Sequence, residues 1–247
     1  MLRMKAMSRF ILGAVIVVWS FATAAAQGPI VVELFTSEGC SSCPPADSVL
    51  RELSRQPANS NPQLVLLGEH VDYWNYIGWT DRFSSSQFSQ RQSDYAHAFH
   101  LGGGYTPQMV IDGQVQFVGN DPTDVWRKIE AAAKDPKPVQ VGLQWQGNNL
   151  QINLTIPPGT SRGKVLMAIT EDGLTTQVGG GENGGRTLHH AAVVRQLREL
   201  GSTDKNSFAT TVAPARDWNA SQLKVAILVQ DPETKKILGA ASTPYPR

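Results

Sequence analysis

The chain has 247 residues, of which 22 are lysine or arginine and 21 are aspartate or glutamate, and its formal charge is +1. Such a balanced charge offers no basic patch of the kind that nucleic-acid-binding proteins use, so we expect no nucleic-acid partner. The length allows one large domain or two ordinary ones.

The first 26 residues have the features of a secretory signal peptide. Three basic residues within the first nine precede an apolar run from position 10 to 21, and small residues at 22–26 supply a cleavage site. The apolar run is shorter than the roughly 20 residues of a membrane span, which argues against an uncleaved anchor. Cleavage after Ala26 removes three basic residues and no acidic ones, so the charge changes from +1 to −2. We expect a periplasmic or secreted protein with no membrane span after cleavage, where disulfides persist.

The sequence has two cysteines, Cys40 and Cys43, which form a C-x-x-C pair directly after the apolar run at 30–35. The run is typical of a strand covered on both faces, and Pro44 to Leu53 is the predicted helix, since prolines are tolerated in a first turn. In this setting the first thiolate attacks a substrate disulfide and the second resolves the mixed disulfide. The alternative is a structural disulfide, but so short a loop would stabilise little by the chain-entropy account.

Cys40 is the expected nucleophile because it lies at the helix N-terminus, where unpaired N–H groups favour a thiolate. Cys43, one turn further in and less exposed, is the expected resolving thiol. Ser41 and Ser42 bring no cation and Glu38 is a nearby negative charge, so we expect a moderate pKa shift at Cys40.

The rest of the first half alternates strand and helix and ends at a linker. A buried strand at 64–67 is followed by a helix at 87–100 with hydroxyl caps at 84–86, a hairpin at 109–118 with the turn Asp112-Gly113, and a helix with apolar residues at 125, 126 and 129. The segment 134–138, with two prolines and three charged residues, indicates a linker. We therefore predict domains at 27–135 and 139–247.

The order β-α-β-α-β-β-α matches the minimal thioredoxin fold. In thioredoxin-like proteins a cis proline that faces the dithiol precedes the hairpin, and Thr106-Pro107 stands at that place. A proline is required there because only an X-Pro bond makes the cis form cheap enough to be held. The alternative is an ordinary trans turn proline.

The sequence of residues 31–47, with its motif G-C-x-x-C-P-P-A-D, resembles that of a family of secreted bacterial thioredoxin-fold proteins of unknown function. The likeness extends through 70–74, 78–79, Thr106-Pro107 and 182–188, and so covers nearly all of the mature chain. The resemblance implies the fold but supplies no reaction. Because thioredoxins carry an aspartate on the first strand, Glu33 is a candidate buried acid beneath the dithiol, although pairing with a basic group is an alternative.

An aromatic segment follows the second strand, at the sheet edge where ligands of open α/β folds usually lie. Trp74, Tyr76 and Trp79 are candidate substrate-binding residues there. The alternative is that these rings pack between the two domains.

Metal binding is the main rival chemistry. Cys40 and Cys43 are suited to Cu(I), with His70 or Met109 completing the set, as in a copper chaperone. His97 and His100, three apart on the predicted helix, are by default a solvated face. We predict no resident cofactor or metal.

Two further segments of the sequence carry candidate chemistry. His189 and His190 are adjacent, so on a strand they would point to opposite faces. Residues 180–187 have phosphate-loop spacing, but Arg186 replaces the lysine, and a glycine-rich connection between strands is favoured.

Beyond the linker, apolar residues alternate with polar ones, the pattern of a half-buried strand. Strands are predicted around 141–145, 150–156, 165–169, 187–195, 208–212, 223–229 and 237–241. We therefore expect an α/β thioredoxin-like domain followed by an all-β immunoglobulin-like sandwich domain. The predicted function is a thiol-disulfide oxidoreductase that acts on periplasmic protein thiols or disulfides, with a redox partner protein. The alternative is a copper-binding chaperone or a non-enzymatic binding module.

Overall fold

The computed structural model describes residues 28–57 and 59–246, so the signal-peptide prediction lies outside the described residues. The first half contains β1 (Ile30–Thr36), α1 (Pro44–Ser54), β2 (Leu64–His70), the short 3₁₀ helix η1 (Asn75–Ile77), α2 (Ser86–Ala98), β3 (Gln108–Ile111), β4 (Val115–Phe117) and α3 (Pro122–Ala132). The second half contains β5 (Gln140–Gln146), β6 (Asn149–Thr155), β7 (Lys164–Glu171), β8 (Leu174–Gln177), β9 (Thr187–His190), β10 (Val193–Ser202), β11 (Ser207–Thr211), η2 (Ala220–Gln222), β12 (Leu223–Gln230) and β13 (Ile237–Pro244).

The ends of the helices follow from local capping chemistry. Two prolines occupy the first turn of α1, where no intrahelical N–H is needed. The side chain of Ser85 accepts a hydrogen bond from the N–H of Gln87 at α2, and Asp121 accepts one from Thr123 at α3. The predicted helices are thus confirmed, with α2 ending two residues earlier than expected.

The hairpin between β3 and β4 is confirmed at the predicted turn. Asp112 and Gly113 have φ angles of 49° and 66°, the left-handed values that a type I′ turn requires at both central positions. The side chain of Asp112 also makes contacts outside the turn. It accepts the N–H of Val31 at 2.8 Å and pairs with Lys137 Nζ at 2.8 Å, so the hairpin is tied to β1 and to the segment before β5.

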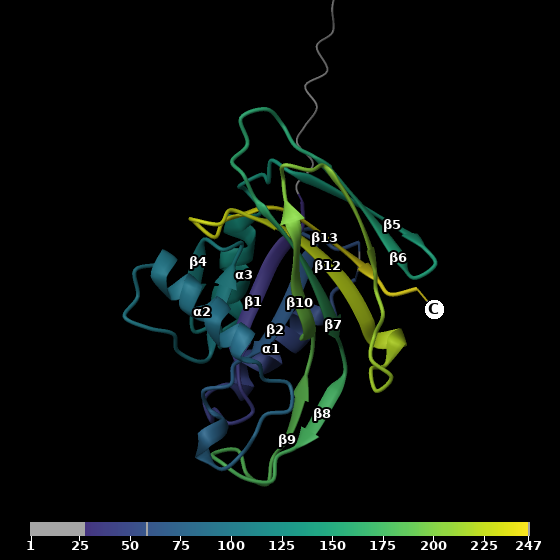
Figure 1. Ribbon diagram of the computed structural model, residues 1–247. Coiled ribbons are helices and arrows are strands. Elements are labelled where there is room, and N and C mark those ends of the chain that lie inside the picture. The colour runs from purple at the N-terminus through teal and green to yellow at the C-terminus, as the bar shows by residue number, and fades with distance from the viewer. Residues whose placement is uncertain (1–27, 58, 247) are drawn as a thin grey trace, which may run out of the picture.

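A single sheet of eight strands runs through both halves of the chain, in the order β13-β12-β7-β10-β2-β1-β3-β4. β2 is parallel to β1 and β3 is antiparallel to it. The halves join where Val193 of β10 pairs with Gly68 of β2, and the N–H of Gly68 donates to the carbonyl of Ala192 at 2.7 Å. Figure 1 shows β10 and β7 beside β2 and β1.

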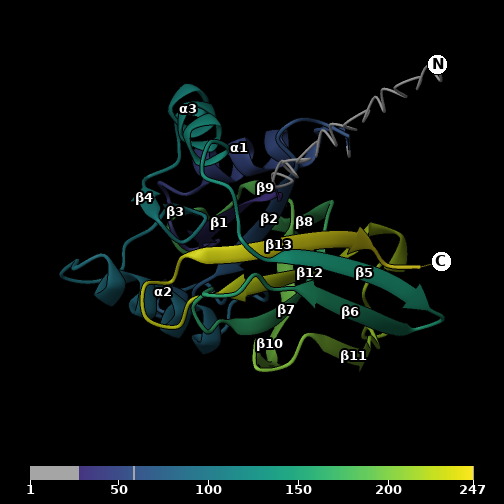
Figure 2. The same ribbon diagram turned by 90° about the horizontal axis from the view of Figure 1, so that it is seen from above.

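Helices and a second sheet cover the faces of the long sheet (Figure 2). On β1 the even-numbered residues pack against α1 and α3, and the odd-numbered ones face α2. The three-stranded sheet β11-β6-β5 packs its apolar side on strands of the second half, around Met167 and Ile227. The strands predicted around 141–145, 150–156, 165–169, 208–212, 223–229 and 237–241 are confirmed as β5, β6, β7, β11, β12 and β13, although β7 and β12 are buried on both faces. β8 was not predicted, and 187–195 forms two strands instead of one.

The segment between the halves is anchored to the sheet. Lys137 is 5% exposed and forms a buried ion pair with Asp112, and the N–H of Val139 donates to the carbonyl of Leu238 at 2.8 Å. No helix within the described residues is long and apolar enough to cross a membrane.

Candidate functional site

The C-x-x-C pair forms a disulfide at the start of α1. Cys40 and Cys43 are bonded to each other, and Cys43 is the N-cap of the helix. Both residues are 0% exposed, so the expected difference in exposure between them is wrong. The two serines between them are exposed, so the motif turns its serines to solvent and both cysteines inward.

The Thr106-Pro107 segment lies beside the disulfide. Its peptide bond is cis, as the sequence predicted. The hydroxyl of Ser42 donates to the carbonyl of Thr106 at 3.4 Å, and Ser42 Oγ is also 3.4 Å from Cys40 Sγ. Trp74 donates its indole N–H to the hydroxyl of Thr106 at 2.8 Å. The proline loop, the motif and the aromatic segment therefore meet at one place.

The three aromatic candidates have different environments. Trp74 packs closely on Gly39, where an added Cβ would come within 3.1 Å of the Trp74 Cβ. Trp79 donates to Glu38 Oε2 at 2.8 Å and lies against Gly179 and Gly181 of the second half, which agrees with the packing alternative. Tyr76 is 83% exposed. Of the three, Tyr76 offers a free ring to a partner.

A hairpin from the second half covers the motif. β8 and β9 form a two-stranded ribbon whose connecting loop, residues 178–186, reaches the segment 38–41. Asn183 is fully buried and donates to the carbonyl oxygens of Glu38 and Cys40, both at 2.9 Å. Glu182 Oε2 accepts the N–H of Ser41 at 3.0 Å. In Figure 1 this ribbon extends beyond the long sheet toward the end of the molecule where β1 and β2 finish.

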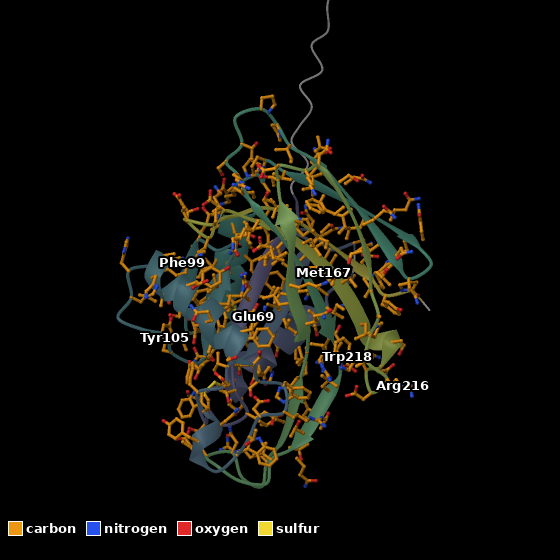
Figure 3. All side chains as sticks on the ribbon, in the orientation of Figure 1. Glu69, Phe99, Tyr105, Met167, Arg216 and Trp218 are labelled. Atoms are coloured by element: carbon orange, nitrogen blue, oxygen red, sulfur yellow. A yellow bond between two sulfur atoms is a disulfide. The ribbon has the colours of Figure 1, made fainter. Side chains whose placement is uncertain are left out.

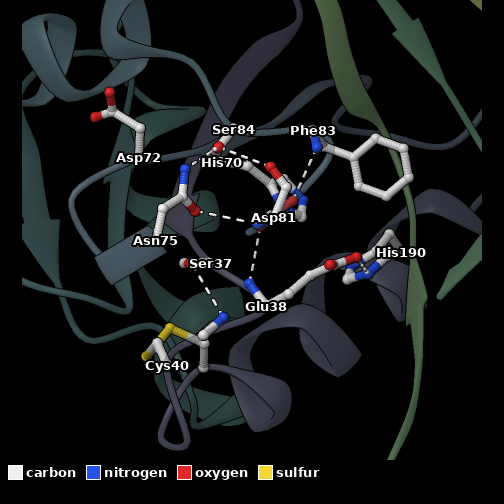
Figure 4. A network of polar contacts seen from close by, with 12 residues as sticks. Ser37, Glu38, Cys40, His70, Asp72, Asn75, Asp81, Phe83, Ser84 and His190 are labelled. Atoms are coloured by element: carbon white, nitrogen blue, oxygen red, sulfur yellow. Dashed lines mark hydrogen bonds and ion pairs between the residues drawn. A yellow bond between two sulfur atoms is a disulfide. The ribbon is translucent and has the colours of Figure 1, made fainter. Parts of the chain in front are cut away.

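A buried polar network lies behind the motif (Figure 4). Glu38 turns its carboxylate to His190 Nε2, at 3.2 Å, while its own N–H donates to Asp81 Oδ2 at 2.9 Å. Asp81 also pairs with His70 Nδ1 at 2.6 Å. All four of these residues are at most 3% exposed. The network therefore joins the motif, the loop after η1, and strands β2 and β9.

Within this network, Asp81 and His70 stabilise each other's charged form. Burial opposes ionisation of Asp81, but its charge pairing and hydrogen bond with His70 lower its pKa below the ordinary value. Burial likewise disfavours the His70 cation, but Asp81 raises the pKa of His70. Burial raises the pKa of Asp47, on the inner face of α1 one turn after Cys43, against the influence of His190 and His70. Burial alone would raise the pKa of Glu38, but hydrogen bonds to His190 and Trp79 lower it below the ordinary value.

Glu33 is buried but does not lie beneath the disulfide, and the alternative expectation, pairing with a basic group, is the one confirmed. It is an odd-numbered residue of β1, so it faces α2 while α1 covers the opposite face. Arg91 pairs with Glu33 at 2.6 Å and with Glu69 at 3.3 Å, and Tyr95 donates to Glu33. Burial raises the pKa of Glu69 well above its ordinary value. Figure 3 shows Glu69 near the centre of the molecule, beside α2.

A family model described as "Protein of unknown function (DUF1223)" matches residues 31–230. The chain belongs to this family. Among solved structures, protein AGR_C_4864 from Agrobacterium tumefaciens is similar at 27% identity and a TM-score of 0.73, over 90% of this chain and 96% of that one. HBP35 of Porphyromonas gingivalis is similar at 14% identity and a TM-score of 0.65, over 88% and 75%. No curated protein matches.

The metal candidates of this DUF1223 chain have other partners. His70 is engaged by Asp81, and Met109 is buried in the apolar cluster under α1 and α3. His97 and His100 are exposed, the default for such a pair, and His189 and His190 point to opposite faces as expected. Within residues 28–57 and 59–246, no three His, Cys, Asp or Glu side chains are grouped to hold a metal ion.

Sequence reasoning missed four residues that shape this site of the DUF1223 chain. These residues are Asp81, Glu182, Asn183 and His190, and each lies 43 to 152 positions along the chain from the motif residue that it contacts. The family resemblance of residues 182–188 is the sequence feature that could have pointed to this loop. The glycine spacing of 180–187 instead favours a simple connection between two strands.

Proposed function

We propose that the protein exchanges disulfides with protein substrates, with Cys40 as the nucleophile and Cys43 as the resolving thiol. The observation that carries the proposal is the Cys40–Cys43 disulfide at the first turn of α1, with the Thr106 carbonyl 3.4 Å from the hydroxyl of Ser42. A redox pair needs its first cysteine at a helix start and an accessible backbone beside it for a substrate chain.

The arrangement of the first half supports a thioredoxin-like module. β2 is parallel to β1, β3 is antiparallel to it, and β4 pairs outside β3. α1 packs on one face and α2 on the other. In this reading the second half is a sandwich-like partner of the module that shares its sheet. The predicted secretory leader supports a periplasmic or secreted location, where protein disulfides are the available substrates.

In the oxidising direction, the Cys40–Cys43 disulfide takes two electrons from a pair of substrate thiols. A substrate thiolate attacks Cys40 Sγ, the Cys40–Cys43 bond breaks, and its electron pair passes to Cys43, which takes a proton. A second substrate thiolate then attacks the substrate sulfur of the mixed disulfide and releases Cys40, which takes the second proton. The substrate gains a disulfide and loses two electrons, and the pair gains them. The reverse steps reduce a substrate disulfide.

The burial of both cysteines adds a requirement to this chemistry. A substrate sulfur reaches Cys40 only after the cover of the motif moves, and the contacts that hold it include two hydrogen bonds from Asn183 and one to Glu182. These are three hydrogen bonds, of which the one to Glu182 is exposed, so their opening is compatible with exchange in solution.

The test uses single-cysteine variants of the full mature chain. Cys43→Ser keeps the attacking thiol but cannot resolve, so it should accumulate mixed disulfides with periplasmic proteins, whereas Cys40→Ser should accumulate none and lose turnover of a disulfide substrate. The double variant is the control for unspecific capture, and far-UV circular dichroism checks that each variant folds. Absence of trapped proteins, together with stoichiometric Cu(I) binding by the reduced wild type, would favour a binding module instead.

A further inference from the structure

The acidic side chain that contacts the redox motif comes from the other half of the chain. Glu182 Oε2 accepts the N–H of Ser41, the residue directly after Cys40, at 3.0 Å across 141 positions of sequence. The hydroxyl and N–H of Ser41 lower the pKa of Glu182, so the carboxylate is ionised at neutral pH. A negative charge is therefore held beside the backbone of the expected nucleophile.

The motif has few other N–H groups left to stabilise a Cys40 thiolate. The N–H of Cys40 donates to the carbonyl of Ser37, and that of Cys43 donates to the carbonyl of Cys40. The next two residues, Pro44 and Pro45, have no N–H at all. The N–H of Ser41 is taken by Glu182. The usual advantage of a helix N-terminus for a thiolate is thus reduced before the disulfide opens.

Neighbouring side chains do not replace this lost stabilisation with a cation. Glu38 is turned to His190 and Trp79, and Arg186 donates to the amide oxygen of Asn183 at 3.0 Å. The hydroxyl of Ser42, 3.4 Å from Cys40 Sγ, is a neutral donor. Neutral hydrogen bonds stabilise an anion less than charged ones do.

We propose that Glu182 disfavours the Cys40 thiolate and thereby lowers the reduction potential of the cysteine pair, which sets the pair to donate electrons to substrate disulfides. This deepens the proposed function by giving it a direction. A dithiol whose reduced form is poorly stabilised is a reductant, because stabilisation of the reduced form is what makes a pair oxidising.

In the reducing direction, the Cys40–Cys43 dithiol gives two electrons to a substrate disulfide. The Cys40 thiolate attacks a substrate disulfide and expels one substrate thiolate, and the Cys43 thiolate then attacks Cys40 and expels the second. Two electrons pass to the substrate, whose sulfurs take up the two protons, and the pair becomes a disulfide. A protein dithiol must supply the two electrons that restore it.

The experiment equilibrates the full mature protein with glutathione redox buffers and measures the reduced fraction in wild type and in Glu182→Gln and Glu182→Lys. Gln keeps an oxygen for the Ser41 N–H but removes the charge. We expect the equilibrium constant for reduction to rise about threefold to tenfold in Glu182→Gln, with tenfold equal to about 30 mV, and to rise further in Glu182→Lys. The rise should shrink in 1 M salt because the charge is exposed. Glu52→Gln, an exposed glutamate at the other end of α1, is the control and should match wild type.

A second measurement separates a charge effect from a loosened loop. In the Cys43→Ser background, the pH dependence of Cys40 alkylation should shift to lower pH when Glu182 is replaced by Gln. An equilibrium constant for Glu182→Gln within twofold of wild type, or a shift that 1 M salt leaves unchanged, would overturn the inference. Failure of the proposed function looks different, since the pair would then exchange with glutathione but trap no protein in Cys43→Ser.

Discussion

One carboxylate, that of Asp81, binds both the backbone of the C-x-x-C motif segment and a histidine. Its Oδ2 accepts the Glu38 N–H at 2.9 Å and pairs with His70 Nδ1 at 2.6 Å, and its Oδ1 accepts the N–H of Phe83 at 2.9 Å. Because the group is 2% exposed, each of these contacts replaces a hydrogen bond to water that folding removed. The position of the segment before Cys40 thus depends on a charge that the motif itself does not contain.

His70 should make stability depend on pH around neutrality. Its ring faces Asp81, and Asp47, Glu38 and the ring of His190 are the other titratable groups near it. Since the folded pKa of His70 is raised above the unfolded value of about 6.5, the stabilisation is fully present below that pH and is lost as pH rises through the folded pKa.

Urea unfolding midpoints between pH 6 and pH 9 check this prediction. The wild type should lose stability over that range, and His70→Asn, which has no titrating ring, should lose less. Equal slopes for the two proteins would show that His70 does not carry the effect. His97→Asn, at an exposed helix position, is the matched control and should keep the wild-type slope.

At the scale of elements, the β8–β9 hairpin acts as a cover for a helix start in the other half of the chain. Its 178–186 loop is closed on itself by hydrogen bonds between Val178 and Arg186 and between Gly185 and Val178, at 2.9 and 2.8 Å. Arg51 of α1 donates to the carbonyl of His189 at 3.4 Å. The ribbon is therefore placed by α1, and its loop in turn holds the segment that precedes α1.

Loss of the Asn183 amide should speed reduction of the disulfide. Asn183→Ala removes two hydrogen bonds to motif carbonyls, and at about 1 kcal/mol each their loss should make opening roughly tenfold or more frequent. Stopped-flow reduction by a small phosphine measures the rate. Asn148→Ala, in the exposed turn between β5 and β6, should react at the wild-type rate. If Asn183→Ala also reacts at that rate, the loop does not control access.

At the scale of the whole molecule, one apolar cluster draws on both halves. It contains Val31, Leu67 and Phe88 from the first half together with Leu166, Leu197 and Leu228 from the second. The sheet is continuous through the contact of β10 with β2. Neither half can expose its side of this cluster to water without a large loss of hydrophobic stabilisation.

A core substitution in the second half should therefore destabilise the first half. Leu228, fully buried in β12, becomes a cavity in Leu228→Ala, with an expected cost of about 3 kcal/mol. Hydrogen exchange under increasing urea should show peptides of 28–134 and of 139–246 unfolding at one lowered midpoint. A first half that keeps its wild-type midpoint would mean that the halves unfold independently. Val115→Ala, at an exposed edge-strand position, is the control and should change the midpoint little.

Local patterns in the sequence were sufficient for most of the elements. The prolines in the first turn of α1, the caps of α2 and α3, the Asp112-Gly113 turn and the alternation of apolar residues beyond residue 139 each depend on residues a few positions apart. They can therefore be predicted without the fold. The adjacency of strand, C-x-x-C pair and helix is local in the same sense. The placement of a proline before the hairpin predicted the cis bond that Thr106-Pro107 has.

Only the tertiary structure shows which charged groups and which loop contact the cysteine pair. Glu33 was assigned to the wrong face because a shift of one residue along a strand reverses the side to which a side chain points. Asn183 reaches Cys40 across 143 positions, and Val193 meets Gly68 across the segment at 134–138. Such contacts arise from the packing of whole elements, and no periodicity within one segment records them. The sequence alone thus determined a dithiol at a helix start, and only the fold showed it to be covered and held by the other half.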